Sequence, residues 1–325
     1  MTEKKHLKAL IRARMARTGE SFTAARSHIV AQPSEPSLSL LAEWKAHDKH
    51  CMTAVFTPDD EHIISGGFGG QARIWTPDGE PAGELEGHDS SVNVIRISSD
   101  GATAVTASSD KTVRVWDLPE RSPRVVLGKH KKQVLALDLD EANDLVWSGG
   151  HDGKLQRWSL ASESLEETID IGGSVTSVAV RRSDRVVAVA TVGGGVSIRD
   201  AAGGEITRLD TDAKVTTAAS WSTDGAFLIV SSPGGATIWS TQDWEPVRTL
   251  ASGSGGMLPV AMSPDGSRIA LGWDNHMALW SADEDVPGVT LDKLPKGVYG
   301  IRFSHDGTRL AMAAADGRVR VYAVA

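Results

Sequence analysis

The stretch "SSDKTVRVWDL", residues 108–118, contains an alternating apolar segment that ends at Trp116 and follows a turn with Asp110. Similar segments recur along the chain at steps of 41, 42, 41, 40, 41 and 42 residues. The residues that end them are Trp75, Trp116, Trp158, Arg199, Trp239, Trp280 and Tyr322. Seven copies at a nearly fixed period indicate a repeat architecture, because such periods are typical of stacked structural units.

Each repeat contains the pattern of four short strands. In the copy around Trp116, an alternating segment at 92–97 precedes the turn SSDG at 98–101 and a second segment at 102–107. The segment that ends at Trp116 and a fourth near 124–127 follow. The turn recurs as STDG at 222–225, SPDG at 263–266 and SHDG at 304–307, and a fourth-position glycine suits type I turns. Four antiparallel strands in roughly 41 residues predict one blade of a propeller.

With these features the chain resembles WD40-repeat proteins over residues 37–325. Blades of that family carry a hydrogen-bonded tetrad of His, Ser or Thr, Asp and Trp. The resemblance implies two complete structural tetrads: His88, Thr106, Asp110 and Trp116, and His130, Ser148, Asp152 and Trp158. A third copy has His47, Ser65 and Trp75, but Gly69 stands where the Asp belongs. The later copies lack the His and the Ser or Thr, and two of them keep the turn carboxylate as Asp274 and Asp316.

The two ends of the chain predict how the ring closes. The seventh copy stops at Ala325, soon after Tyr322, so it has no fourth strand of its own. Residues 37–44, in "SLSLLAEWKAH", have the pattern of a fourth strand that leads to His47. We therefore expect this segment to complete the seventh blade and remove its open edge. The fold class is all-β: a seven-bladed WD40-like β-propeller at 37–325, closed by an N-terminal strand.

A short basic arm precedes the predicted ring. Residues 1–30 have helical periodicity in two pieces, separated by Thr18 and Gly19, and a proline-containing linker follows at 31–36. The arm holds seven Lys and Arg residues against Glu3 and Glu20, a charge of +5, whereas the rest of the chain is −13. Docking on the propeller or a partner, contact with nucleic acid or an anionic membrane, and a solvated tail all remain open. The acidic body argues against tight nucleic-acid binding.

Composition limits the location and the chemistry. No run of about eighteen apolar residues occurs, so no transmembrane segment is expected. The N-terminus lacks the uninterrupted apolar stretch of a secretory signal, and Cys51 is the single cysteine, so we predict a cytoplasmic protein. Abundant Ala, Gly, Val and Arg suggest a bacterial source. No common zinc, phosphate-binding or nucleophile motif is present, and we expect no metal, no cofactor and no catalytic residues.

The prediction is therefore a non-catalytic scaffold that binds a protein or peptide. The resemblance places partners on the face where the loops before the first strands and the turns between second and third strands open near the axis. The bulkier residues directed there are expected to form the partner site: His50, Met52, Phe68, Leu135, His151, Leu258, Trp273 and Tyr299. Some of these side chains could instead plug the axis. The alternative function is an enzyme or small-molecule binder that uses the axial pocket, which the fold does not exclude.

Overall fold

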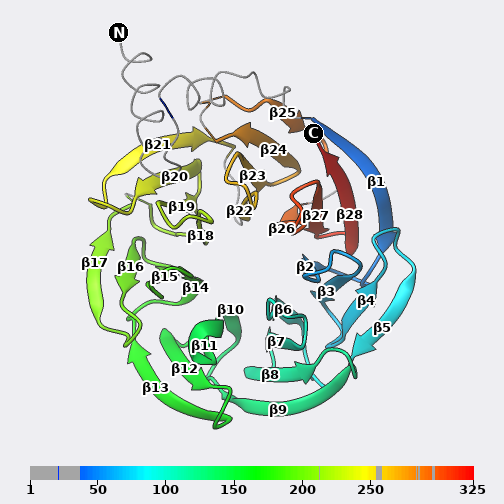
Figure 1. Ribbon diagram of the computed structural model, residues 1–325, viewed down its shortest axis with the longest axis vertical. Helices are drawn as coiled ribbons and strands as arrows, with labels where there is room; N and C mark the ends of the chain where they lie inside the picture. Colours follow the sequence, from blue (N-terminus) through cyan, green and yellow to red (C-terminus); the bar gives the residue numbers. More distant parts are fainter. Residues whose placement is uncertain are drawn as a thin grey trace.

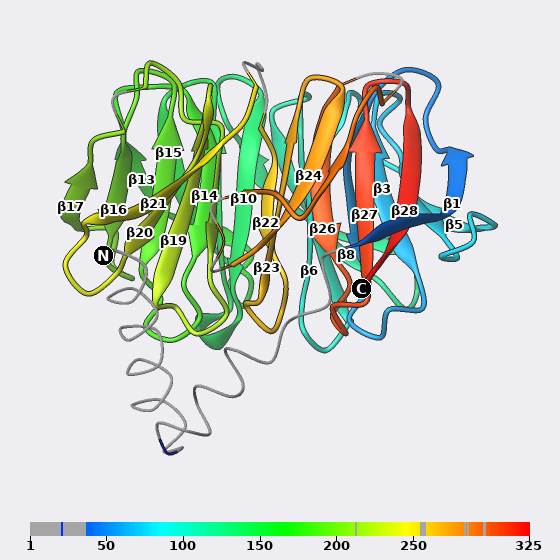
Figure 2. The same ribbon diagram turned by 90° about the horizontal axis from the view of Figure 1, so that it is seen from above.

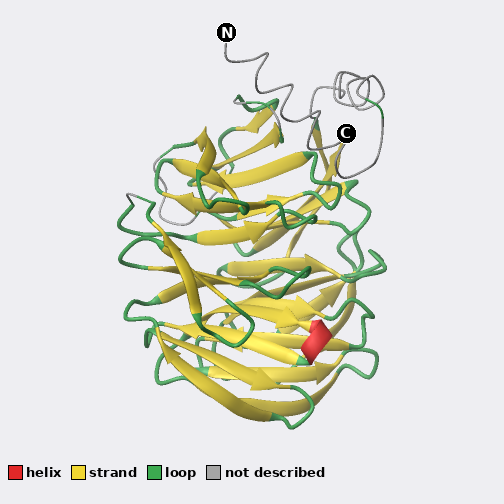
Figure 3. Cartoon of the chain, turned by 60° about the vertical axis from the view of Figure 1, so that its left-hand side comes forward, coloured by secondary structure: helices red, strands yellow, loops and turns green. Residues whose placement is uncertain are grey.

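The computed structural model describes Ser21 and residues 37–211, 213–253, 258–282, 284, 286–294 and 297–325. The predicted helical arm at 1–30, apart from Ser21, and the linker at 31–36 lie outside these described residues. Within the described ranges the protein is a ring of seven four-stranded antiparallel sheets (Figure 1). The one helical element described is the 3-10 turn η1, Glu141–Asn143 (Figure 3). The predicted seven-bladed all-β propeller is therefore confirmed.

In each blade the first strand lies next to the axis and the fourth lies at the outer rim (Figure 1). Blades 1 to 3 comprise β2 Cys51–Phe56, β3 Ile63–Gly67, β4 Ala72–Trp75 and β5 Pro81–Leu85; β6 Val92–Ile97, β7 Thr103–Ser108, β8 Thr112–Asp117 and β9 Ser122–Lys129; and β10 Val134–Asp140, β11 Leu145–Gly150, β12 Lys154–Ser159 and β13 Ser164–Asp170. Blades 4 to 6 comprise β14 Val175–Val180, β15 Val187–Thr191, β16 Val196–Arg199 and β17 Glu205–Leu209; β18 Ala218–Trp221, β19 Phe227–Ser232, β20 Gly235–Ser240 and β21 Pro246–Ala251; and β22 Val260–Met262, β23 Arg268–Trp273, β24 His276–Ser281 and β25 Val289–Leu291. Blade 7 comprises β26 Val298–Phe303, β27 Arg309–Ala314, β28 Arg318–Val324 and the N-terminal strand β1 Leu38–Lys45.

The N-terminal strand closes the ring, as the sequence predicts. β1 pairs antiparallel with β28 from Leu38 opposite Val324 to Lys45 opposite Arg318, with one bulge on the way. Figure 2 shows the blue β1 beside the red β28. The strand starts and ends one residue later than expected, and the amides of Ala46 and His47 both donate to the carbonyl of Gly317 at 2.9 Å. The outer edge of blade 7 is therefore paired rather than open.

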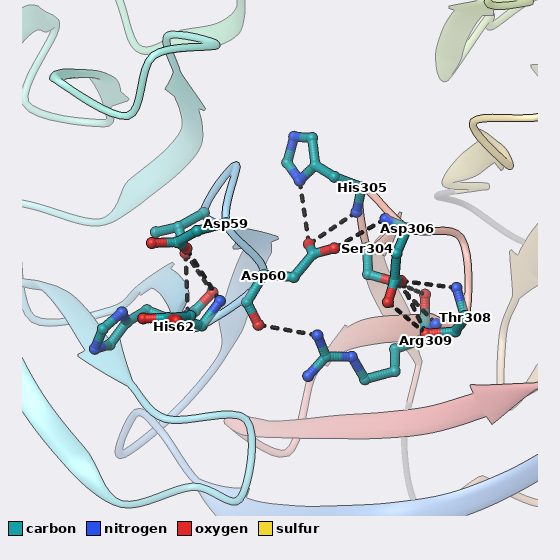
Figure 4. Close-up of polar contacts among 10 residues, drawn as sticks. Asp59, Asp60, His62, Ser304, His305, Asp306, Thr308 and Arg309 are labelled. Atoms are coloured by element: carbon teal, nitrogen blue, oxygen red, sulfur yellow. Dashed lines mark hydrogen bonds and ion pairs between the residues drawn. The ribbon is translucent and has the colours of Figure 1, made fainter.

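A second contact joins blade 1 to blade 7, between the turns that follow the first strand of each blade (Figure 4). The carboxylate of Asp60 accepts the backbone N–H groups of His305 and Asp306, each at 2.8 Å, and His305 Nδ1 lies 3.2 Å away. Arg309 Nη2 donates to the Asp60 carbonyl at 2.9 Å. Carboxylate–amide bonds of this kind are stronger than bonds between neutral groups. The turn of blade 1 thereby holds the SHDG turn of blade 7 in place.

The hydrophobic core is divided among the seven blade–blade interfaces, each of which has its own cluster of buried residues. The strands supply these clusters because alternate side chains point to opposite faces of each sheet. Trp116, Trp158 and Trp280 are among the largest fully buried side chains. The anchor residues read from the repeat therefore form much of the packing between neighbouring blades.

Candidate functional site

The tetrad residues of blades 2 and 3 lie on one face of the ring, which we call the tetrad face. In blade 2, Trp116 Nε1 donates to Thr106 Oγ1 at 2.8 Å, and that hydroxyl lies 2.7 Å from His88 Nε2. His88 Nδ1 lies 2.7 Å from Asp110 Oδ2. Blade 3 has the corresponding contacts among Trp158, Ser148, His130 and Asp152, at 2.8, 2.8 and 3.1 Å in the same order. Both ring nitrogens of each buried imidazole are thus satisfied.

The ionisation of these groups follows from their burial. Burial by itself would raise the pKa of Asp110, but hydrogen bonds from Thr112 and His88 outweigh it and lower that pKa to about 2. Burial also lowers the pKa of His88 and of His130, although their aspartates oppose the change. At neutral pH we therefore expect neutral imidazoles next to ionised carboxylates, a state suited to holding loops.

Blade 1 has the same histidine without the carboxylate. His47 Nε2 lies 3.0 Å from Ser65 Oγ, and Trp75 Nε1 donates to that oxygen at 2.9 Å. Within the described part of the chain, His47 Nδ1 has no hydrogen-bond partner. Burial, together with the nearby Arg73, lowers the pKa of His47 to about 4. The glycine at position 69 therefore leaves a buried polar group unsatisfied.

An aromatic group gathers on the tetrad face where blades 1 and 7 meet. The ring of His50 meets Phe68 edge-on at 5.1 Å and Tyr299 at 5.6 Å between centroids. Lys49 Nζ lies 5.9 Å from the centre of the Phe68 ring. Phe68 is 41% exposed, and His50 and Tyr299 are partly buried. We call His50, Phe68, Tyr299 and Lys49 the rim cluster.

A hydrogen bond sets the orientation of His50. Its Nδ1 lies 2.7 Å from the carbonyl oxygen of Ala315, which accepts only, so Nδ1 carries the proton. Nε2 is then an acceptor in the neutral ring, without a partner in the described residues. The bond runs from blade 1 to blade 7, so the rim cluster is held by the same seam that closes the ring.

The structure places the other expected partner residues unequally. Met52 and Leu135 are partly buried on the first strands, and His151 is exposed, with Nδ1 at 2.7 Å from Ser174 Oγ. Leu258 is only 1% exposed and belongs to the core between blades 5 and 6. Leu258 is therefore not available on the surface, contrary to expectation.

Trp273 also differs from expectation, because it packs between blades. Its ring stacks on His276 at 5.6 Å and 10° and lies 6.3 Å from Trp280. Trp273 is the last residue of β23 and pairs directly with His276 across a two-residue turn. That turn is one residue shorter than the turn that precedes β8, so Trp273 takes the strand position of the buried Ser108 and not that of Ser109, although Asp274 follows it directly. A shift of one residue turns a strand side chain to the other face.

The described residues offer little for catalysis. No group of three His, Cys, Asp or Glu side chains within them is arranged to hold a metal ion. Cys51 is fully buried, and burial raises the pKa of its thiol, so it is a poor nucleophile. His151 and Ser174 resemble a base–nucleophile pair, but no carboxylate in the described part of the chain bonds to the free nitrogen of His151. Oriented catalytic pairs need such a third group.

Two features of this face were not found from the sequence. Lys49 was not among the expected partner residues, although a cation beside the predicted His50 is a visible signal. The bond from His50 to Ala315 joins residues that are 265 positions apart, and no local pattern shows it.

Comparisons with known proteins agree with this architecture. The family model "WD domain, G-beta repeat" matches residues 38–76, 79–117 and 289–323. Pre-mRNA-processing factor 19 homolog 2 of Arabidopsis thaliana is 25% identical over 262 residues, which are 78% of this chain and 47% of that protein. Transducin beta-like protein 3 of Bos taurus is 29% identical over 47% of this chain and 20% of its own length. Ribosome biogenesis protein YTM1 of Chaetomium globosum is 28% identical over 34% of this chain and 25% of its own.

This chain spans less than half the length of each of these relatives. The three come from a plant, an animal and a fungus, so they give no support to a bacterial source. Among the described residues, no helix is long and apolar enough to cross a membrane.

Proposed function

The chain belongs to the WD40-repeat β-propeller family, and from this premise we propose that it is a non-catalytic scaffold that binds a protein or peptide through the rim cluster. The relatives are named for different processes, pre-mRNA processing and ribosome biogenesis among them. Different processes on one architecture favour a shared binding platform over a shared reaction.

The observation that carries this proposal is the exposed, pre-positioned aromatic group at the seam of blades 1 and 7. Aromatic side chains are enriched at protein interfaces, and truncating such anchors weakens binding more than truncating most contacts does. Phe68 is the one aromatic among the exposed large apolar side chains of the described residues. Because His50 holds Phe68 and Tyr299 by edge contacts, binding would cost little side-chain entropy.

The chemistry of the rim cluster also defines the contact. Phe68 and Tyr299 provide apolar faces, Lys49 a cation, and the free nitrogen of His50 an acceptor. A peptide with an apolar anchor, a carboxylate and a neighbouring hydrogen-bond donor fits these groups. The proposed binding residues are the rim cluster, His50, Phe68, Tyr299 and Lys49, with Met52, Leu135 and His151 at the periphery; Leu258 and Trp273 are no longer included.

Affinity capture with the full chain tests the proposal. The partner is identified from a lysate of the source organism, purified, and titrated against wild type, Phe68→Ala and Leu165→Ala. Leu165 is a matched control because it is 45% exposed but lies on β13 at the outer rim. We expect Phe68→Ala to weaken binding about thirtyfold or more without lowering the melting temperature. Equal affinities for wild type and Phe68→Ala would reject the rim cluster as the binding site.

Two finer predictions accompany this proposal. We retain a cytoplasmic location as a prediction, which imaging of a tagged full-length chain would test. We also propose that the basic arm at 1–30 contacts the same partner or a second one, because its charge of +5 contrasts with that of the propeller. Removal of residues 1–30 should then change affinity or salt dependence without unfolding the ring.

A further inference from the structure

Seven residues lie at one level of the axis, which we call the axial ring. Each lies on a first strand and pairs with a second-strand residue whose partner on the third strand directly precedes the anchor residue of its blade. In blade order they are Val55, Arg96, Asp138, Ala179, Ser220, Ala261 and Arg302. The side chains of Arg96 and Asp138 are 22% and 21% exposed although their strands are the innermost of the ring, so solvent reaches this level (Figure 1).

Two of the three charged members satisfy each other. Arg96 Nε donates to Asp138 Oδ1 at 2.8 Å, from blade 2 to blade 3. The second oxygen of Asp138 accepts the backbone N–H of Val180 at 2.7 Å, from blade 4. Each carboxylate oxygen thus already has a donor, and Asp138 compensates one arginine.

Arg302 occupies the position of Arg96 in blade 7 but has no such acid. In the blade that follows Arg96 the equivalent position holds Asp138, whereas in the blade that follows Arg302 it holds Val55. The hydrogen bond given by Arg302 is from Nη1 to the carbonyl of Ile301 at 2.8 Å, which resembles the bond from Arg96 Nη1 to Ile95. Burial, followed by repulsion from Arg96, lowers the pKa of Arg302 to about 9, although attraction to Asp138 opposes the change. At neutral pH this guanidinium is still charged, and no carboxylate of the described residues forms an ion pair with it.

The axial-ring residues of blades 4, 5 and 6 carry no charge. Blades 4, 5 and 6 contribute Ala179, Ser220 and Ala261, whose side chains are short. The ring therefore has two guanidinium groups on one arc and small residues on the other. An unpaired buried charge is costly, and an arriving anion offsets that cost.

We propose that the axial ring binds a small oxyanion of the phosphate class through the guanidinium groups of Arg302 and Arg96. The planar fork of arginine matches the spacing of two oxygens on a phosphate, sulfate or carboxylate group. Asp138, on blade 3, holds the guanidinium of Arg96 in place and neutralises one of the two positive charges. The ring then carries a net single positive charge, which suits a small anion. This site is separate from the rim cluster and does not depend on the proposed partner binding.

Titration calorimetry and melting temperature with inorganic phosphate test the proposal. Phosphate is used at low millimolar concentration against chloride of equal ionic strength, because phosphate at high concentration stabilises most proteins by exclusion from their surface. Sulfate and acetate in parallel separate tetrahedral oxyanions from carboxylates. We expect phosphate to bind wild type and raise its melting temperature, and Arg302→Met to weaken binding about tenfold or more.

Two further variants sharpen the result. Val55→Asp supplies to Arg302 the carboxylate that Arg96 already has, so we expect it to abolish the response to phosphate. Arg182→Met is a control, because the side chain of Arg182 is 80% exposed and lies outside the ring; it should respond like wild type. Because Arg302→Met removes an uncompensated charge, it should fold and melt no lower than wild type in chloride. The proposal is overturned if wild type shows no phosphate-specific response, or if Arg302→Met keeps it.

Discussion

Blades 2 and 7 use the same turn aspartate with different partners. In blade 2, Asp110 lies 2.7 Å from His88, a neutral imidazole from the loop that precedes the blade. In blade 7, Asp316 accepts Arg320 Nη2 at 2.6 Å, and Arg320 also pairs with Glu43 of β1 at 2.5 Å. Arg320 is only 3% exposed. Blade 2 is built from continuous chain, whereas blade 7 joins the two ends of the propeller.

The comparison separates two roles of this aspartate. In both blades it accepts the backbone N–H two residues further on, Thr112 at 2.8 Å and Arg318 at 3.0 Å. Aspartate is favoured in turns for this local bond. The side-chain partner is then free to differ: a histidine fastens a preceding loop, and an arginine fastens the closing strand. Asp316 therefore carries a network of its own, although its blade lacks the tetrad.

Deleting the closing strand should have the largest effect. Removal of residues 1–47 takes away β1 together with Glu43, and leaves β28 with an open edge. We expect aggregated or molten protein by size-exclusion chromatography and near-UV circular dichroism. Removal of residues 1–30 keeps β1 and should leave a folded ring. A monomeric 1–47 deletion with an unchanged melting temperature would show that blade 7 does not need this strand.

Asp316→Ala should be the most destabilising of the point substitutions compared here. It leaves the buried Arg320, which is charged at any accessible pH, with Glu43 alone. Breaking a buried ion pair is costly, and because one acid remains we expect a loss of about 2–4 kcal/mol in the free energy of unfolding. Urea denaturation measures the loss. A loss smaller than that of Asp110→Ala would show that Glu43 alone is sufficient for Arg320.

Asp110→Ala and Asp152→Ala should each cost about 1–3 kcal/mol, because each removes the carboxylate that bonds to a buried but neutral imidazole. The loss at Asp110 should be the smaller of the two, since His88 Nδ1 keeps Thr112 Oγ1 at 3.1 Å as a partner. Asp89→Ala is the matched control. The side chain of Asp89 is exposed in the loop that holds His88, so this variant should stay within about 0.5 kcal/mol of wild type. The same urea measurements apply. Losses at Asp110 and Asp152 no larger than the control would mean that the tetrads add no stability.

The smallest effect concerns His47, which takes in blade 1 the place of His88 in blade 2 but has no aspartate beside it. Its pKa is lowered from about 6.5 to about 4, so below pH 6.5 the unfolded chain gains a proton that the native chain does not accept. Stability from this group is present above pH 6.5 and decreases as the pH falls towards 4. Between pH 6.5 and 5.5 we expect a loss of about 1 kcal/mol. Over the same pH range His47→Gln should lose about 1 kcal/mol less unfolding free energy than wild type does, since His88 and His130 titrate alike in both proteins. Identical pH profiles of the two proteins would contradict the assignment.

The sequence by itself determined the number of blades, the strand pattern and the closure. A period of about 41 residues repeats local features, such as alternating side chains and turns that need a positive φ at Gly101 or Gly307. These depend on neighbours in the chain, so the expected 92–97 strand coincides with β6, and the closing strand is displaced by one residue. The atoms of both predicted tetrads lie at hydrogen-bond distance for the same reason, because their spacing is fixed within one repeat.

Only the tertiary structure decided which side chains meet across blades and which face the surface. A turn shortened by one residue packed Trp273 against the core between blades 5 and 6, and the periodicity gives no sign of so small a change. Arg320 met Glu43 and His50 met Ala315 because ring closure brings together residues that lie more than 260 positions apart. Arg302 lacks an acid because its neighbour across that closure is Val55. Long-range partners depend on the geometry of the whole ring, and for that reason a local pattern does not contain them.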